Sequence, residues 1–227
     1  MIALAIDTST EAQVLGLRVE AEDYERFEIA GRVHSRIILP SILALLQDAG
    51  ITRKDLDVIV FGRGPGSFTG LRIAVGVVQG LAYGLDIPVV PVSTLACLAQ
   101  GEYRRSGATD IVVAQVARRD EVFFGSYCVR AGLAQRVGNE GVFDAASVPT
   151  QPFTACVGIG SGWRLKEKLE VALGAHATDI VLDVHPHGRD LLDLGMSGFE
   201  AGAAVAALEA RPEYLRERVA TLPGDSH

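Results

Sequence analysis

A glycine-rich stretch between two apolar segments constrains the fold of this chain more than any other feature. It runs Gly62-Arg63-Gly64-Pro65-Gly66-Ser67-Phe68-Thr69-Gly70, after the apolar residues Val58–Phe61 and before a long apolar segment. This order predicts a strand, a tight loop and the start of a helix. Backbone N–H groups at such a start can bind an anion. The lysine of a phosphate-binding loop is absent, however, so we favour a structural turn in which Gly64 and Gly66 adopt positive φ and Ser67 caps the helix.

The helix predicted after this loop, Phe68–Leu85, is apolar around most of its circumference. Its only strongly polar residues are Arg72 and Gln79, whereas a helix with one face in water needs an apolar stripe of only ~100°. Glycines recur at every fourth position, as Gly76, Gly80 and Gly84. Each costs roughly 1 kcal/mol relative to alanine, so another element must approach this helix closely. A membrane span is the competing interpretation, but the arginine, the glycines and the helix breakers that follow favour a soluble helix covered on two sides.

The composition is that of a folded protein of two small domains. The chain has 227 residues, of which 48% are hydrophobic and 22% charged, and a domain commonly holds roughly 100 residues. Its net charge of −7 argues against unaided binding of a polyanion such as tRNA. Cys97, Cys128 and Cys156 are odd in number and widely spaced, which favours thiols in a reducing compartment over disulfides or a zinc site. No signal peptide is recognisable, so we predict a cytoplasmic protein without membrane contact.

The pattern of apolar residues predicts the same succession of elements twice. In the first half we expect strands at Ile2–Asp7, Gln13–Val19 and Tyr24–Ile29, a helix at Ser35–Ala49, a strand at Val58–Phe61, the glycine-loop helix, a strand at Pro88–Val92 and a helix at Ser93–Arg104. In the second half we expect strands at Asp110–Val116, Glu121–Val129 and Leu133–Asn139, the segment Asp144–Val148 in place of the first helix, a strand at Phe153–Ile159, a helix at Gly162–Leu173, a strand at Ile180–Val184 and a helix at Arg189–Glu209. This repeat predicts an α/β protein of two RNase H-like domains. We place them at residues 1–106 and 107–227, with the C-terminal tail as a candidate to pack back on the first domain.

Four motifs resemble those of the TsaB family, also called YeaZ. They occur in the family's order along nearly the whole chain, as Ile6-Asp7-Thr8-Ser9-Thr10, His34-Ser35-Arg36 with Leu39-Pro40, Gly64-Pro65-Gly66-Ser67-Phe68-Thr69-Gly70-Leu71-Arg72, and Pro212-Glu213-Tyr214-Leu215-Arg216. The first is also similar to the first phosphate loop of the ASKHA superfamily, which includes sugar kinases, actin and heat-shock chaperones. The resemblance implies the ASKHA architecture and a non-catalytic subunit in the synthesis of threonylcarbamoyladenosine in tRNA. It also implies the partners TsaD, the catalytic subunit, and TsaE, an ATPase, with tRNA reached only through the complex and a homodimer as an option for the free protein.

We predict no catalytic residue, no metal site and no cofactor. In the related TsaD proteins a His-x-x-x-His pair binds a metal, and the matching positions here are Thr94 and Leu98, which cannot do so. His34 is interpreted as a capping or packing residue. His185 and His187 are interpreted as an exposed pair in a turn, without acidic residues at ligand spacing.

A kinase or ATPase of the ASKHA class is the alternative function. Asp7 ends a buried strand and could hold a magnesium-bound phosphate, or it could hydrogen-bond the backbone that follows as a turn residue. The residues alone leave both roles open. The nearest second phosphate loop is Gly158-Ile159-Gly160-Ser161-Gly162, but no convincing adenosine motif is present. A metallopeptidase would need the missing histidines, and an aspartate usual in the family's second-domain hairpin is replaced here by Val116.

Two apolar helices supply the predicted partner surface. The helix Ser35–Ala49 is apolar beyond one face, like Phe68–Leu85, and a small domain has few places to bury both. In the TsaB family these helices pair with their equivalents in TsaD. We expect the bulky arc of Phe68–Leu85 to face the partner and its glycines to face the protein's own sheet, so that Val78→Glu leaves the isolated protein folded. The candidate interface residues are Arg36, Leu39, Ile42, Leu43, Leu46, Phe68, Leu71, Arg72, Val75, Val78, Gln79 and Ala82.

Overall fold

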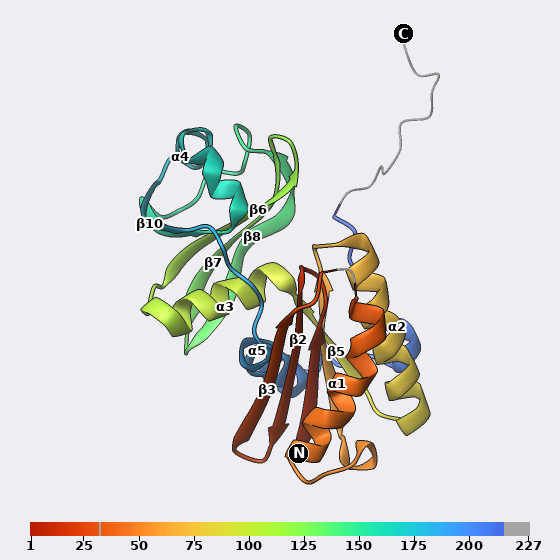
Figure 1. Ribbon diagram of the computed structural model, residues 1–227. Coiled ribbons are helices and arrows are strands. Elements are labelled where there is room, and N and C mark those ends of the chain that lie inside the picture. Colours follow the sequence, from red (N-terminus) through yellow and green to blue (C-terminus); the bar gives the residue numbers. More distant parts are fainter. Residues whose placement is uncertain (32, 216–227) are drawn as a thin grey trace, which may run out of the picture.

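Two five-stranded sheets of the same topology organise the residues that the computed structural model describes, 1–31 and 33–215 (Figure 1). The strand order is β3-β2-β1-β4-β5 in the first sheet and β10-β9-β6-β7-β8 in the second. In each sheet an antiparallel meander of three strands leads into two parallel strands. The strands are β1 (Ile2–Asp7), β2 (Ala12–Val19), β3 (Glu22–Ile29), β4 (Val58–Gly64), β5 (Val89–Ser93), β6 (Asp110–Arg118), β7 (Glu121–Arg130), β8 (Leu133–Asp144), β9 (Ala155–Ile159) and β10 (His176–Val181). The predicted repeat of an RNase H-like topology is confirmed.

Helices cover both faces of each sheet. They are α1 (His34–Asp48), α2 (Phe68–Leu85), α3 (Thr94–Ser106), α4 (Lys166–Leu173) and α5 (Gly188–Glu200), with short 3-10 helices at Arg53–Asp55, Ser161–Leu165 and Ala207–Glu209. One face of the first sheet packs against α1 and α2, where side chains such as Ile38 and Val78 meet Leu4 and Phe61 in one buried cluster. The outer face of the second sheet packs against α4 and the 3-10 turn that precedes it.

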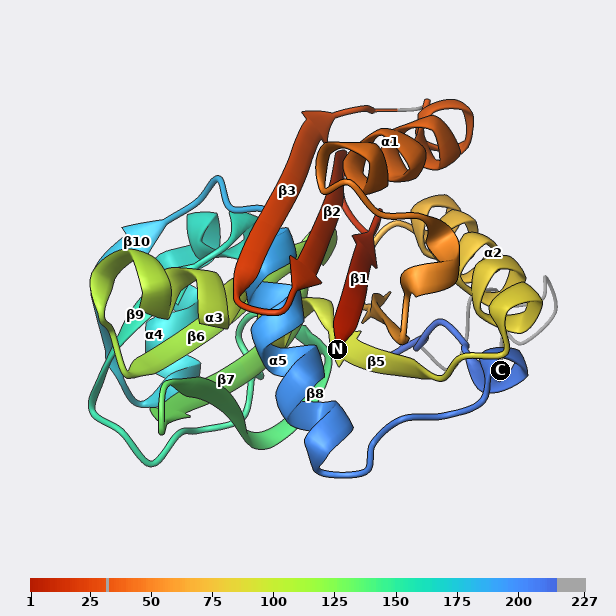
Figure 2. The ribbon, with the colours of Figure 1, turned by 90° about the horizontal axis from the view of Figure 1, so that it is seen from below.

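The inner faces of the two sheets are covered by helices from the opposite half of the chain. Leu191 and Leu192 of α5 pack on Ala3 and Val60 of the first sheet, although α5 follows the strands of the second. Conversely, α3 follows the first sheet but packs on the second, in a cluster that includes Leu95. Figure 2 shows α5 lying beside the strands of the first sheet. The domain boundary after residue 106 stays a prediction, because each sheet comes from one side of it but takes a helix from the other.

The last helix is shorter than expected. It ends at Glu200 instead of Glu209, because Gly202 adopts a positive φ of 79° and the chain turns. The chain then returns to the free edge of β5, where Val205 pairs with Val89. The alanines and glycines after Glu200 led us to predict a helix there. The conformation of this segment is instead decided by its pairing with β5, which is distant in the sequence.

The other boundaries shift by smaller amounts. The expected helix Gly162–Leu173 begins as a 3-10 helix before α4, and β10 lies earlier than the expected strand Ile180–Val184. The segment Asp144–Val148 forms no helix, since β8 runs on to its first residue and a turn follows. The second lobe thus lacks a counterpart of α1 within its described residues.

Candidate protein interface

The glycine loop after β4 is packed against the segment that follows β1. A Cβ atom at Gly66 would overlap the backbone of Ser9, and one at Gly70 would overlap the carbonyl oxygen of Thr8. The N–H of Ser67 donates to the Ser9 carbonyl oxygen (2.7 Å), and the Thr8 hydroxyl donates to the Gly70 carbonyl oxygen (2.7 Å). Gly66 is therefore needed for close packing, and contrary to expectation it is not among the glycines with positive φ. Gly64 has a positive φ of 107°, and the Ser67 hydroxyl accepts a hydrogen bond from the N–H of Gly70 (3.3 Å), as the structural-turn interpretation predicts.

Asp7 is fully buried beneath this loop. Its Oδ1 accepts hydrogen bonds from the N–H (2.7 Å) and the hydroxyl (2.6 Å) of Ser9. The Thr94 hydroxyl lies 3.4 Å from Oδ2 of Asp7 and 3.2 Å from Oγ of Ser9. Burial raises the pKa of the Asp7 carboxyl, and these hydrogen bonds partly oppose the increase. Both carboxylate oxygens therefore have partners within the chain, which is the arrangement of a turn residue.

Thr94 and Leu98, the two positions that we expect to match the TsaD histidines, take part in packing. Thr94 belongs to the Asp7 cluster, and Leu98 is buried between α3 and the second sheet. His34 begins α1, and its Nε2 lies 3.2 Å from the carbonyl oxygen of Thr10; burial lowers the pKa of its imidazole. Among residues 1–31 and 33–215, no group of three or more His, Cys, Asp or Glu side chains could hold a metal ion.

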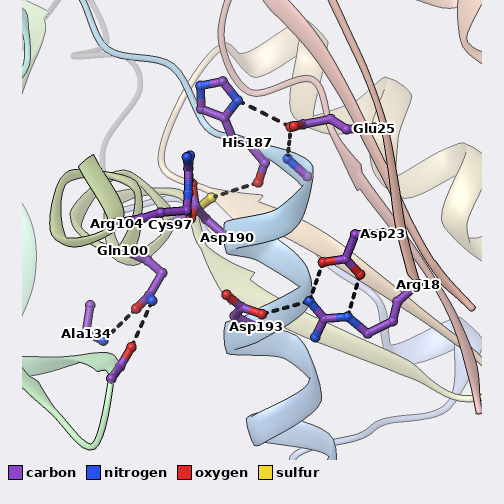
Figure 3. A network of polar contacts seen from close by, with 12 residues as sticks. Arg18, Asp23, Glu25, Cys97, Gln100, Arg104, Ala134, His187, Asp190 and Asp193 are labelled. Atoms are coloured by element: carbon purple, nitrogen blue, oxygen red, sulfur yellow. Dashed lines mark hydrogen bonds and ion pairs between the residues drawn. The ribbon is translucent and has the colours of Figure 1, made fainter. Parts of the chain in front are cut away.

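His185 and His187 have acidic neighbours that the sequence did not reveal. Nδ1 of His187 lies 3.3 Å from Oε1 of Glu25 on β3, and Nε2 of His185 lies 3.9 Å from Oε1 of Glu11. The His187 ring also stacks on Phe27, with ring centroids 5.4 Å apart. The hydrogen bond to Glu25 raises the pKa of His187. This pair therefore ties the segment before α5 to the first sheet, as Figure 3 shows for His187 and Glu25.

The helices α3 and α5 are joined by an ion pair between an exposed arginine and a buried aspartate. Asp190 on α5 is completely buried, and the Arg104 guanidinium on α3 reaches both of its carboxylate oxygens, at 2.8 and 2.9 Å. The Cys97 thiol lies nearby, 3.6 Å from the carbonyl oxygen of His187, and burial raises its pKa well above the usual range. Such a thiol is an inert packing group.

The bulky arc of α2 faces the protein's own core, so the expected orientation of this helix was wrong. Six candidate interface residues are at most 7% exposed: Ile42, Leu46, Leu71, Val75, Val78 and Ala82. All of them except Leu71 pack against the first sheet in a single cluster, and Leu71 lies against Gly64 of the glycine loop. The physical reason is that branched side chains bury apolar area on the sheet, whereas glycine has no side chain to bury. These residues cannot contact a partner in this structure.

The outer side of α2 is formed by its glycines. Among residues 1–31 and 33–215, apart from its chain neighbours and the helix's own backbone, no heavy atom lies within 4 Å of a Cβ placed at any member of the glycine ridge, which is Gly76, Gly80 and Gly84. Apolar side chains flank this ridge: Leu39 (49% exposed), Leu43 (58%), Phe68 (49%) and Tyr83 (69%). Arg36 and Arg72 are also exposed, and Gln79 is half-buried. Tyr83 was absent from the predicted interface, although its position on the outer side of the helix could have suggested it.

By length and composition alone, α2 could cross a membrane. It has 18 residues and a mean hydropathy of 1.3, and a third of it is buried. A core helix of a soluble protein passes the same test, and α2 packs its larger side chains on the first sheet. One such helix is weak support for a membrane span.

A C-terminal segment contacts the two strongly polar residues of α2, Arg72 and Gln79. We call residues 203–215 the C-terminal strap. The side-chain amide of Gln79 donates to the carbonyl oxygen of Ala210 (2.8 Å), and Nε of Arg72 donates to the hydroxyl of Tyr214 (3.2 Å). At its end the strap carries Glu213, which forms an ion pair with Arg63 of the glycine loop (2.8 Å). Arg72 and Gln79, both expected in the partner interface, therefore each form a hydrogen bond within the chain itself.

Comparison with known proteins identifies the family. Residues 27–154 match the TsaD family, described as tRNA N6-adenosine threonylcarbamoyltransferase. The tRNA threonylcarbamoyladenosine biosynthesis protein TsaB of Escherichia coli is 37% identical over 99% of both chains, and the TsaB protein of Haemophilus influenzae is 35% identical over 97% of both. The solved structure of YeaZ from Pseudomonas aeruginosa is 39% identical, with a TM-score of 0.86 over 94% of this chain and 99% of that chain. The fold, the four motifs and these full-length matches show that the chain belongs to the TsaB (YeaZ) family of tRNA threonylcarbamoyladenosine biosynthesis proteins.

Proposed function

We propose that this protein is a non-catalytic subunit that binds a TsaD protein through the exposed side of α1 and α2. In that complex it supports the transfer of a threonylcarbamoyl group to the adenosine beside certain tRNA anticodons. The observation that supports the proposal best is the glycine ridge. Three interior glycines cost a helix about 3 kcal/mol relative to alanines, and nothing within the described chain uses the space that they leave.

A helix from another protein would use this space. The axes of packed helices ordinarily lie about 8–10 Å apart, depending on the side chains between them. Because the glycine ridge has no Cβ atoms, a partner helix could approach α2 to the shorter of these distances. The exposed leucines of α1 and Tyr83 of α2 border the ridge. Such side chains supply the apolar centre of an interface, with aromatic residues favoured.

The inner residues of the fold support a role without catalysis. Thr94 and Leu98 occupy the positions of the TsaD histidines and engage in packing. The glycine loop is filled by the backbone of Thr8 and Ser9, which disfavours the alternative of an ASKHA kinase. TsaD therefore performs the transfer in this proposal, and the present chain contributes a surface.

In this proposal the protein reaches tRNA and the ATPase TsaE through its complex with TsaD. A chain with a net charge of −7 repels a polyanion at long range, so we expect negligible tRNA binding by the protein alone. Synthesis of a tRNA modification also agrees with a cytoplasmic location. A homodimer of the free protein would use the same exposed side of α1 and α2.

Co-purification with TsaD of the same organism tests the proposal. The parent protein should form a complex whose mass in solution is that of the two chains together, and Gly80→Leu should abolish it by filling the ridge. The control Glu167→Leu places the same side chain at an exposed position of α4, and it should bind as the parent does. Undiminished binding by Gly80→Leu would show that the partner contacts another surface.

A further inference from the structure

Arg72 is held in one orientation by two aromatic side chains beside the glycine ridge. Its guanidinium carbon lies 3.9 Å from the ring centroid of Phe68, and its Nε donates to the Tyr214 hydroxyl at 3.2 Å. The two rings contact each other, with centroids 5.6 Å apart. Phe68 and Tyr214 are each about half exposed, and Arg72 is exposed. A flexible side chain is thereby ordered before any partner arrives, which lowers the entropic cost of binding.

The N–H groups on the two terminal nitrogens of this guanidinium remain available for hydrogen bonds. An arginine has five N–H groups, and the hydrogen bond to Tyr214 uses the one on Nε. Among residues 1–31 and 33–215, no carboxylate oxygen lies within 4.0 Å of Arg72. The adjacent Arg63, in contrast, is neutralised by Glu213. The edge formed by Nη1 and Nη2 is therefore free to donate two parallel hydrogen bonds, the geometry in which arginine binds a carboxylate or a phosphate.

Two arginines are exposed on α1 and α2 although the whole chain is acidic. Arg36 and Arg72 are exposed near the N-terminal ends of α1 and α2. No Asp or Glu occurs in α2, and the one in α1, Asp48, is paired with Arg26 of β3. Asp86 is exposed just past the C-terminal end of α2, so among the described residues the guanidinium groups of α1 and α2 without acidic counterparts lie only near the N-terminal ends of these helices. The electrostatic complement of these groups is an acidic surface.

We infer that Arg72 binds a carboxylate side chain of the protein that packs on the glycine ridge. The inference rests on the proposed function and adds the chemistry of one contact. A protein carboxylate fits better than an RNA phosphate, because the surroundings of Arg72 are aromatic and aliphatic and because a phosphate backbone is bound by extended basic surfaces. Arginine and tyrosine are also among the residues that most often dominate binding energy in protein interfaces.

Binding of the purified protein to TsaD at low and high salt, about 0.05 and 0.5 M NaCl, tests the inference. Arg72→Gln should weaken the affinity about tenfold to a hundredfold at low salt, as expected for the loss of charge-assisted hydrogen bonds. The loss should be smaller at high salt. Arg72→Lys keeps the positive charge but lacks the planar guanidinium. Its affinity for TsaD should lie between those of the parent and of Arg72→Gln. The control Arg164→Gln removes an exposed arginine from the other lobe and should bind as the parent does.

A charge exchange identifies the partner group. Arg72→Glu should abolish binding, and a lysine substituted for one acidic residue of TsaD should restore it. If Arg72→Gln binds TsaD as tightly as the parent while Gly80→Leu does not bind, this inference is overturned and the proposed function stays intact. If Gly80→Leu itself binds as the parent does, the proposed function is overturned. If Arg72→Gln leaves TsaD binding unchanged but weakens retention of tRNA by the assembled complex, the group bound is a phosphate and the inference is wrong.

Discussion

Two glycines of α2 should respond in opposite directions to the same substitution. Gly80 lies on the exposed ridge, where a new methyl group meets no atom within 4 Å. Gly80→Ala should therefore stabilise the free protein by about 1 kcal/mol, the difference in helix propensity between the two residues. For a chain of 227 residues, 1 kcal/mol corresponds to an increase in Tm of roughly 2–4 °C.

Gly70→Ala should have the reverse effect. A Cβ atom at this position would lie far inside the 3.0 Å that real Cβ contacts keep, against the carbonyl oxygen of Thr8. That oxygen belongs to the backbone, so it cannot move as a flexible side chain can. Overpacking of this kind costs about 1–3 kcal/mol, which exceeds the gain in helix propensity, and Tm should fall by several degrees.

Calorimetric unfolding of the parent and the two variants measures both effects, and each scan should be repeated at two protein concentrations. The repetition is needed because a homodimer through the ridge would make Tm depend on concentration. If Gly80→Ala lowers Tm at every concentration, the ridge is packed within the free chain and our reasoning is refuted. The same variant should bind TsaD less tightly than the parent, so stability and binding should change in opposite directions.

Three further predictions follow from buried or paired groups. Val78→Glu should unfold the isolated protein, because Val78 is 0% exposed in the apolar core and a buried, unpaired carboxylate costs several kcal/mol. Circular dichroism should show the loss of structure. The control Thr69→Glu, at an exposed site of the same helix, should remain folded. Arg104→Gln leaves the Asp190 carboxylate buried without its partner and should lower the free energy of unfolding in urea by about 3 kcal/mol, the lower end for such a loss because Arg104 is itself partly exposed. The hydrogen bond to Glu25 raises the pKa of His187 above its ordinary 6.5, so its stabilising contribution is complete below pH 6.5 and is lost as pH rises through the folded-state pKa; His187→Asn should remove that part of the pH dependence, and an unchanged profile would contradict it.

The first half of the fold could be predicted from local patterns. The range Phe68–Leu85 was correct to the residue, because a serine cap and an apolar run mark its start and Asp86, in the left-handed region, marks its end. The orientation of the same helix was predicted wrongly. We took its glycines as the sign of contact with the protein's own sheet, but the area buried by Leu71 and Val78 decides which side of a helix faces inward.

The contacts that complete the candidate site are non-local. Gln79 and Ala210 are 131 residues apart in the sequence, and His187 and Glu25 are 162 apart. The local sequence pattern around these residues does not indicate which distant residue each will contact. The two pairs are brought together by the paths that the segment before α5 and the C-terminal strap take across the first sheet and α2. The exposure of Arg72 could be anticipated from the helix pattern, but its ordering by Tyr214 could not.

The exchange of helices between the two sheets delays the folding of a nascent chain. All strands of the first sheet have been synthesised by Ser93, but α5 begins only at Gly188, roughly 100 residues later. At an elongation rate of about 5–20 residues per second, the apolar inner face of that sheet waits roughly 5–20 s for its cover. During this interval α3 has emerged without the sheet on which it will pack. The inner face of the first sheet, though its strands are made first, therefore cannot be covered until α5 has been synthesised.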